Sequence, residues 1–79
     1  MKVVEICWQD SWIDTCDMKI KKAKKLKPII RSTVGYLVSD NDDWVVLSTD
    51  KFKKGKHINA PMVIPKGMIL GYWEYEDIS

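Results

Sequence analysis

Residues 31–50, RSTVGYLVSDNDDWVVLSTD, decide the fold class of this 79-residue chain. Two runs rich in β-branched and aromatic residues, 29–39 and 44–48, flank the acidic turn DNDD. Asn and Asp tolerate left-handed backbone in such turns, so the stretch predicts an antiparallel hairpin. Gly35 lies in the middle of the first run and predicts a bulge or sharp bend, which lets a short sheet curl on itself.

Strand patterns continue on both sides of this hairpin. Residues 2–9 predict a first strand, because Val4, Ile6 and Trp8 alternate on one face. Residues 62–64 and 68–75 predict the last two strands, with a tight Pro-Lys-Gly turn between them.

A short helix is predicted over residues 14–27, between the first two strands. Asp14 or Thr15 can cap it, and Pro28 ends it because proline disfavours helical geometry in the residue before it. A helix of this length is marginal alone, so we expect it to dock on the sheet.

The order of one strand, one helix and four more strands predicts a mainly β (α+β) fold. We expect one domain over residues 1–79, built as a small bent five-stranded antiparallel sheet or barrel with one short helix after the first strand. A chain this short buries only about 60% of its unfolded surface. Self-association through an open edge strand is therefore expected.

The net charge of +2 conceals two separate lysine clusters, while the acids lie elsewhere in the chain. Such lysines either keep a surface soluble or form a phosphate track, beside which exposed aromatic rings stack bases. Four tryptophans in a small chain also suggest rings at a protein interface, if they do not fill the core. The candidate binding residues are Lys21, Lys22, Lys24, Lys25, Lys51, Lys53, Lys54, Lys56, Trp12, Trp44, Trp73 and Tyr75.

Metal binding and catalysis find little support in the sequence. Structural zinc needs four Cys or His ligands, usually in close pairs, and the chain offers only Cys7, Cys16 and His57. The acids of the turn at 40–43 lack the central Gly and distal Glu of a calcium loop. Cys16 stands early in the predicted helix, where the dipole lowers a thiol pKa, but no partner for it is evident. We therefore expect no metal, no cofactor and no enzyme activity.

The sequence also suggests a compartment. Its first residues, MKVVEICWQD, lack the apolar run of a signal peptide, and no segment approaches the roughly 20 apolar residues that span a bilayer. A cytoplasmic protein with reduced thiols and no membrane contact is expected. A disulfide between Cys7 and Cys16 would require an oxidising compartment.

Several short motifs resemble those of small uncharacterised proteins of phages and prophages. The motifs are W-x-D-S, R-S-x-V-G-Y-L-V, V-V-L-S and I-P-K-G-M-I-L, at residues 8–11, 31–38, 45–48 and 64–70. The chain is more loosely similar to Sm-like and SH3-like barrels, which share a short helix and five bent strands. The Sm type implies rings formed by strand pairing between neighbours. Here the helix follows the first strand, and the usual Sm signature residues are absent.

The expected function is therefore binding rather than catalysis. The resemblance implies a phage- or prophage-type accessory protein that engages another macromolecule, either a second copy of itself or a host protein. Nucleic-acid or nucleotide binding through the two lysine clusters is the alternative.

Overall fold

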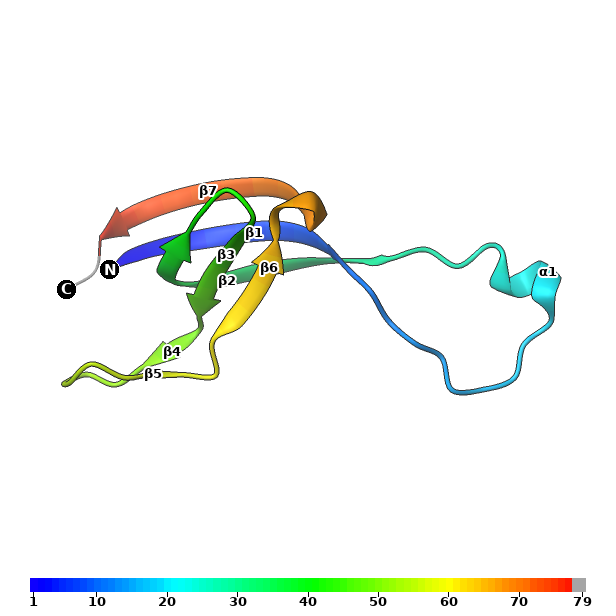
Figure 1. Ribbon diagram of the computed structural model, residues 1–79, viewed down its shortest axis with the longest axis horizontal. Coiled ribbons are helices and arrows are strands. Elements are labelled where there is room, and N and C mark those ends of the chain that lie inside the picture. The colour runs from blue at the N-terminus through cyan, green and yellow to red at the C-terminus, as the bar shows by residue number, and fades with distance from the viewer. Residues whose placement is uncertain (78–79) are drawn as a thin grey trace.

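The computed structural model describes residues 1–77 and is built mainly from antiparallel strands (Figure 1). Its main sheet has the order β6–β3–β2–β1–β7, in which the last strand returns to pair with the first. The strands of this sheet are β1 (Lys2–Asp10), β2 (Ile29–Asp40), β3 (Trp44–Ser48), β6 (Met62–Pro65) and β7 (Ile69–Asp77). The remaining elements are the helix α1 (Ile20–Ala23), the strands β4 (Asp50–Lys51) and β5 (Ile58–Asn59), and the 3-10 turn η1 (Lys66–Met68).

The core lies on the face of the sheet that the alternation in β1 predicts. Val4 and Ile6 are fully buried and Trp8 is 9% exposed, so the sequence-based assignment of this face is confirmed. Strands β3 and β6 contribute the other buried side chains, and three partly buried residues pack against them. These contributions are Val45, Leu47 and Ile64, with Leu37, Ile69 and Tyr72 at the margin.

Gly35 allows β3 to cross close over β2. A Cβ atom at this position would lie 2.7 Å from the backbone oxygen of Ser48 and 3.2 Å from a methyl carbon of Leu47. The pairing register between β2 and β3 also shifts between Leu37 and Ser39, as it does at a bulge. The irregularity predicted for this strand thus lies at residues 37–39 rather than at Gly35, and Gly35 instead gives room for the Ser48 backbone while Leu47 packs into the core.

Polar pairs fix the strands at both ends of the sheet. The Trp8 indole N–H donates to the Thr33 hydroxyl at 3.0 Å, which satisfies a polar group at the edge of the core. Arg31 is the β2 partner of Trp8, and its Nε lies 2.6 Å from Asp10 Oδ2. At the other end, the Lys66 amide donates to the Asp43 carbonyl at 2.8 Å. The W-x-D-S, R-S-x-V-G and I-P-K-G motifs thus hold the fold.

The sheet is bent, but it does not close into a barrel among the described residues. Strands β6 and β7 remain at its two edges, joined only through η1. The mainly β fold with five antiparallel strands is as predicted, and the barrel is not seen.

The predicted helix over residues 14–27 is wrong in extent and in docking. Only Ile20–Ala23 is helical, and this helix buries none of its residues. Two local effects oppose a longer helix: the Asp14 carboxylate accepts a bond from the Cys16 amide at 2.9 Å, and lysines three and four residues apart repel one another. Residues 11–28 instead form a protruding segment, here called the arm (Figure 1).

The arm makes the molecule elongated. The extents are 51 × 22 × 18 Å and the radius of gyration is 15.9 Å. A compact domain of this length would have a radius of gyration of about 12 Å. The accessible surface is 6448 Å², whereas a compact monomer of this mass exposes about 4,900 Å². The chain therefore presents about 1,500 Å² more surface than its size requires.

Replacing Gly35 with Ala tests the crossing of β3 over β2. The added methyl group meets backbone atoms of Ser48, so we expect unfolding in urea to become easier by about 1–3 kcal/mol. Gly67→Ala is the matched control, because a Cβ there has no neighbour within 4 Å. Equal stability of the two variants would contradict the importance of this contact.

Candidate interaction surfaces

One face of the sheet points away from the core and carries a carboxylate at its centre. Glu5 of β1 pairs with Val34 of β2 and Trp73 of β7, so these three side chains share the outer face. The Tyr75 hydroxyl donates to Glu5 Oε1 at 2.6 Å, and the Ser32 hydroxyl donates to Oε2 at 2.8 Å. These bonds, Tyr75 first, lower the pKa of Glu5 below its ordinary value of 4.5.

Large apolar side chains surround this carboxylate. Trp73 and Tyr75 are each 52% exposed and Val34 is 49% exposed. The indole of Trp73 lies over Gly71, where any added Cβ atom would overlap the ring. Side chains alternate along β7, because Tyr72 packs against the core while Trp73 and Tyr75 face outward. A fixed ring and a fixed carboxylate form a preorganised surface for a partner.

The edge strand β7 adds an unpaired backbone to this surface. It pairs with β1 on one side and is the last strand of the sheet. Register shifts between Lys2 and Val4 and between Cys7 and Trp8 of β1 leave regular pairing along the central part of β7. Leu70 on the same strand is 54% exposed. An edge of this kind is a template for another strand.

On the core side, Tyr72 reaches toward the turn between β2 and β3. Burial of the ring, followed by the charges of Asp40 and Glu74, raises the pKa of Tyr72 to about 12. The hydroxyl is buried, and no described group completes a well-formed hydrogen bond to it, but the nearby carboxylates of Asp40 and Glu74 both favour its protonated form. Each carboxylate has a lysine partner: Lys66 Nζ lies 2.6 Å from Asp40, and Lys2 Nζ lies 3.2 Å from Glu74. Tyr72, the two carboxylates and their lysine partners together stabilise the bend of the sheet and keep the Tyr72 hydroxyl protonated.

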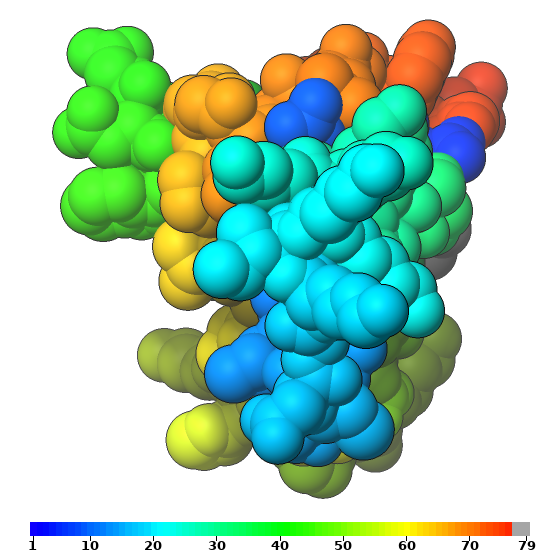
Figure 2. Space-filling view, turned by 90° about the vertical axis from the view of Figure 1, so that its right-hand side faces the viewer, coloured from blue at the N-terminus to red at the C-terminus, as the bar shows by residue number. Residues whose placement is uncertain are grey.

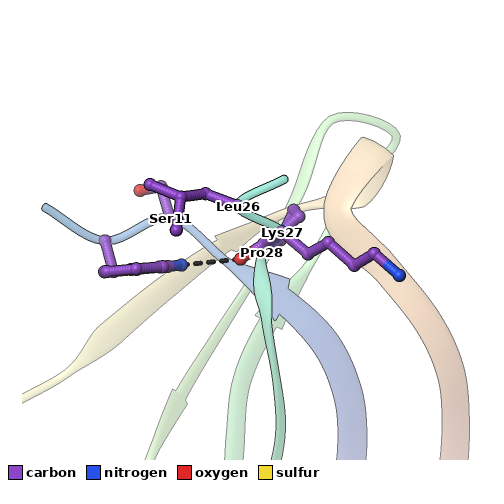
Figure 3. Close-up of a pocket in the computed structure, with 5 residues that line it drawn as sticks. Ser11, Leu26, Lys27 and Pro28 are labelled. Atoms are coloured by element: carbon purple, nitrogen blue, oxygen red, sulfur yellow. Dashed lines mark hydrogen bonds between the residues drawn. The ribbon is translucent and has the colours of Figure 1, made fainter. Parts of the chain in front are cut away.

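The base of the arm holds an open apolar cleft (Figure 3). The Trp12 indole N–H donates to the Lys27 carbonyl at 2.7 Å, which joins the two branches of the arm. Ser11, Leu26 and Pro28 line the cleft beside this bond. Trp12 is 42% exposed, so one part of its ring stays open to solvent.

Beyond this cleft, the arm is strongly basic. No Asp or Glu occurs between Met18 and Ile30, and every lysine in this interval is exposed. Ile20 is 75% exposed and Ile13 is 84% exposed, so apolar side chains lie among the charges. Figure 2 views the molecule with the arm in front, and Figure 1 shows the arm extending away from the sheet. The lysines of the arm are Lys19, Lys21, Lys22, Lys24, Lys25 and Lys27.

The second lysine cluster lies in the β4–β5 hairpin, residues 50–59, at the opposite end of the long axis (Figure 1). The structure therefore does not bring the two predicted lysine clusters together, and they do not form one continuous track. Trp44, 45% exposed, stands beside the acidic turn and is separate from both clusters. Of the predicted aromatic residues, only Trp73 and Tyr75 lie together.

Two residues of these surfaces were missed by sequence reasoning. Glu5 interrupts an otherwise apolar strand, and this break in the pattern is the signal by which it could have been found. Phe52 is the only phenylalanine, stands among lysines in the hairpin, and is 61% exposed. An exposed large aromatic residue in a charged loop is itself an indicator of binding.

The sulfur and histidine side chains do not converge. Cys7 is half-buried in β1, Cys16 is exposed in the arm, and both are free thiols. His57 lies in the hairpin. Within residues 1–77, no group of three or more His, Cys, Asp or Glu side chains is placed to hold a metal ion.

Two further findings complete the description. None of the helical segments within residues 1–77 has the length and apolar character needed to cross a membrane. Comparison of the chain with protein-family models, with curated proteins and with solved structures gave no match.

Tyr75→Phe tests the bond that holds Glu5. A carboxylate whose pKa is lowered in the folded state contributes stability above its unfolded value, and this contribution is lost as the pH falls through the folded value. The variant raises the folded pKa, so we expect acid unfolding, followed by circular dichroism from pH 7 to 2, at a higher pH than in the parent chain. Tyr36→Phe removes a hydroxyl without touching Glu5 and should leave the midpoint unchanged.

Proposed function

We propose that this chain is a non-enzymatic binding protein that works by pairing with another protein, first of all a second copy of itself. The observation that carries the proposal is β7, a nine-residue edge strand that exposes Leu70, Trp73 and Tyr75. Native sheets usually cover or charge an edge of this length. Aromatic side chains near an interface centre supply much of the binding energy.

The surface balance supports the same proposal. A standard protein interface buries about 1,600 Å² of solvent-accessible surface in total, or roughly 800 Å² on each partner. The chain presents about 1,500 Å² more surface than a compact monomer, but the protruding arm contributes to that excess, so it describes the open surface of the whole molecule and not of β7 alone. The small core, with six buried apolar side chains among the residues that the structure describes, gives association a stabilising role.

The proposed biological setting is that of a phage- or prophage-type accessory protein acting in the cytoplasm. The motifs shared with such proteins support this setting, although they serve the fold and do not form a site. The fold is proposed to be an open relative of SH3-like or Sm-like barrels. Five bent strands and one short helix, the features that such barrels share, support that relationship.

Light scattering coupled to size exclusion tests pairing through β7. We expect the apparent mass to rise above 9.2 kDa with concentration, and to stay at that value in the Leu70→Lys, Trp73→Lys double variant. The arm provides a matched control, because Ile13→Lys with Ile20→Lys adds the same charge to two exposed apolar positions away from the edge, which are 84% and 75% exposed against 54% and 52% for Leu70 and Trp73. A monomer at all concentrations, or dissociation by the arm variant alone, would contradict the proposal.

Nucleic-acid binding through the arm is the second candidate. The observation that favours it is the uninterrupted basic interval of the arm beside the ring of Trp12, whose N–H is already satisfied by Lys27. Lysines can then follow the phosphates while an exposed ring stacks a base. Acids lie only on the other branch of the arm, at Asp14 and Asp17.

A salt titration with a random single-stranded oligonucleotide tests this candidate. If all six arm lysines meet phosphates, log K falls against log salt with a slope of about −4. Replacing Lys21, Lys22, Lys24 and Lys25 with Gln should remove most of that slope. The absence of binding at low salt would remove the candidate and would leave pairing through β7 untouched.

A further inference from the structure

The β4–β5 hairpin forms a separate concave site, here called the hairpin pocket. Its volume is about 290 Å³, and Phe52, Lys53, Lys56, His57 and Ile58 are among the residues that line it. Gly55, with φ of 100°, permits the tight tip that turns the chain back. The Phe52 amide donates to the His57 carbonyl at 3.4 Å, so the two walls are joined at the start of the loop.

Ser48 anchors this hairpin to the main sheet. It is 1% exposed, and its hydroxyl oxygen accepts a bond from the Asp50 amide at 3.2 Å. The same hydroxyl lies within hydrogen-bonding distance of the Asn59 carbonyl on the opposite strand. The pocket therefore rests on the part of β3 that Gly35 holds in place, and its base is fixed even though the tip is exposed.

The ionisable side chains that line the hairpin pocket are all basic. Lys51, Lys53 and Lys56 line it together with His57, and none of its lining residues is acidic. The nearest acid in sequence, Asp50, accepts a bond from Asn59 Nδ2 at 3.3 Å. Lys51 Nζ sits 5.1 Å from the centre of the Tyr36 ring, so this cation has a fixed position at the base. Such a concave cationic surface attracts an anion.

The apolar wall selects what kind of anion fits. Phe52 is 61% exposed and Ile58 is half-buried, so a flat ring can lie on them without displacing packed side chains. Ligand pockets usually measure about 300–1,000 Å³, and this one lies at the lower end of that range. Its size suits one aromatic unit with one phosphate.

We propose that the hairpin pocket binds a phosphate ester that carries an aromatic base, in which Phe52 stacks the base while Lys53 and Lys56 contact the phosphate. The ligand is a nucleotide unit, either free or within a single strand. The site is independent of pairing through β7 and of the basic arm, since it shares no residue with either.

Chemical-shift mapping of the full chain at low salt tests the site with AMP, adenosine and inorganic phosphate as probes. We expect AMP to shift the amide signals of residues 51–58, and to bind at least about tenfold more tightly than phosphate or adenosine alone. A short oligoadenylate distinguishes the two sources: tighter binding per site than AMP indicates a strand, and equal binding indicates a free nucleotide. Shifts with AMP that are absent, or that map to the arm, would overturn the proposal.

Three variants separate a built site from general charge. Lys53→Gln with Lys56→Gln should weaken AMP binding about tenfold or more. Phe52→Ala should weaken AMP binding and leave phosphate binding unchanged. The matched control is Lys21→Gln with Lys54→Gln. It also removes two positive charges, one of them from the hairpin, but it changes no residue that lines the pocket. If this control weakens AMP as much as the first variant, the pocket has no specific role.

The edge variant keeps this test distinct from the proposed function. Leu70→Lys with Trp73→Lys should retain full AMP binding, because neither residue lines the pocket. Loss of AMP binding in that variant would show that the site depends on the paired state and would overturn its independence.

Discussion

The close crossing of β3 over Gly35 is the contact on which the rest of the structure depends. Because residue 35 has no side chain, the Ser48 backbone can approach β2 and Leu47 can enter the core beside the buried residues of β1. The same approach buries Ser48, whose hydroxyl then holds both strands of the β4–β5 hairpin. One glycine thereby links the main sheet, the core and the hairpin pocket.

Much of the fold could be predicted because its strands obey simple rules. The alternation of β1 and the acidic turn each follow from local chemistry, and each is present. The arm could not be predicted in the same way. Residues 14–27 have helical propensity, but propensity is weak without an apolar face to dock, and the Asp14 side chain competes for the backbone. Closure into a barrel depends on long-range pairing of edges, which no local pattern specifies.

The candidate surfaces show the same division. Composition and alternation place Trp73 and Tyr75 on one face of the last strand and identify both lysine clusters as charged segments, but they leave open whether the two rings face the core or the solvent. They cannot tell that the two clusters lie at opposite ends of the molecule, since that separation comes from the length of the arm (Figure 1). The role of Glu5 also depends on tertiary contacts, because its two donors come from Ser32 and Tyr75 on neighbouring strands.

An extended arm, an exposed edge and a small core have a common thermodynamic consequence. Few buried side chains leave a narrow margin between the folded and unfolded states of a chain this size. A partner that binds only the folded state raises the free energy of unfolding by about 2.7 kcal/mol when its concentration is a hundred times its Kd. That gain is a large fraction of a marginal stability, so the pairing proposed for the β7 edge would be coupled to folding of the sheet. In the proposed complex, surface residues such as Trp73, which add little to the isolated core, would stabilise the fold through the partner that covers them.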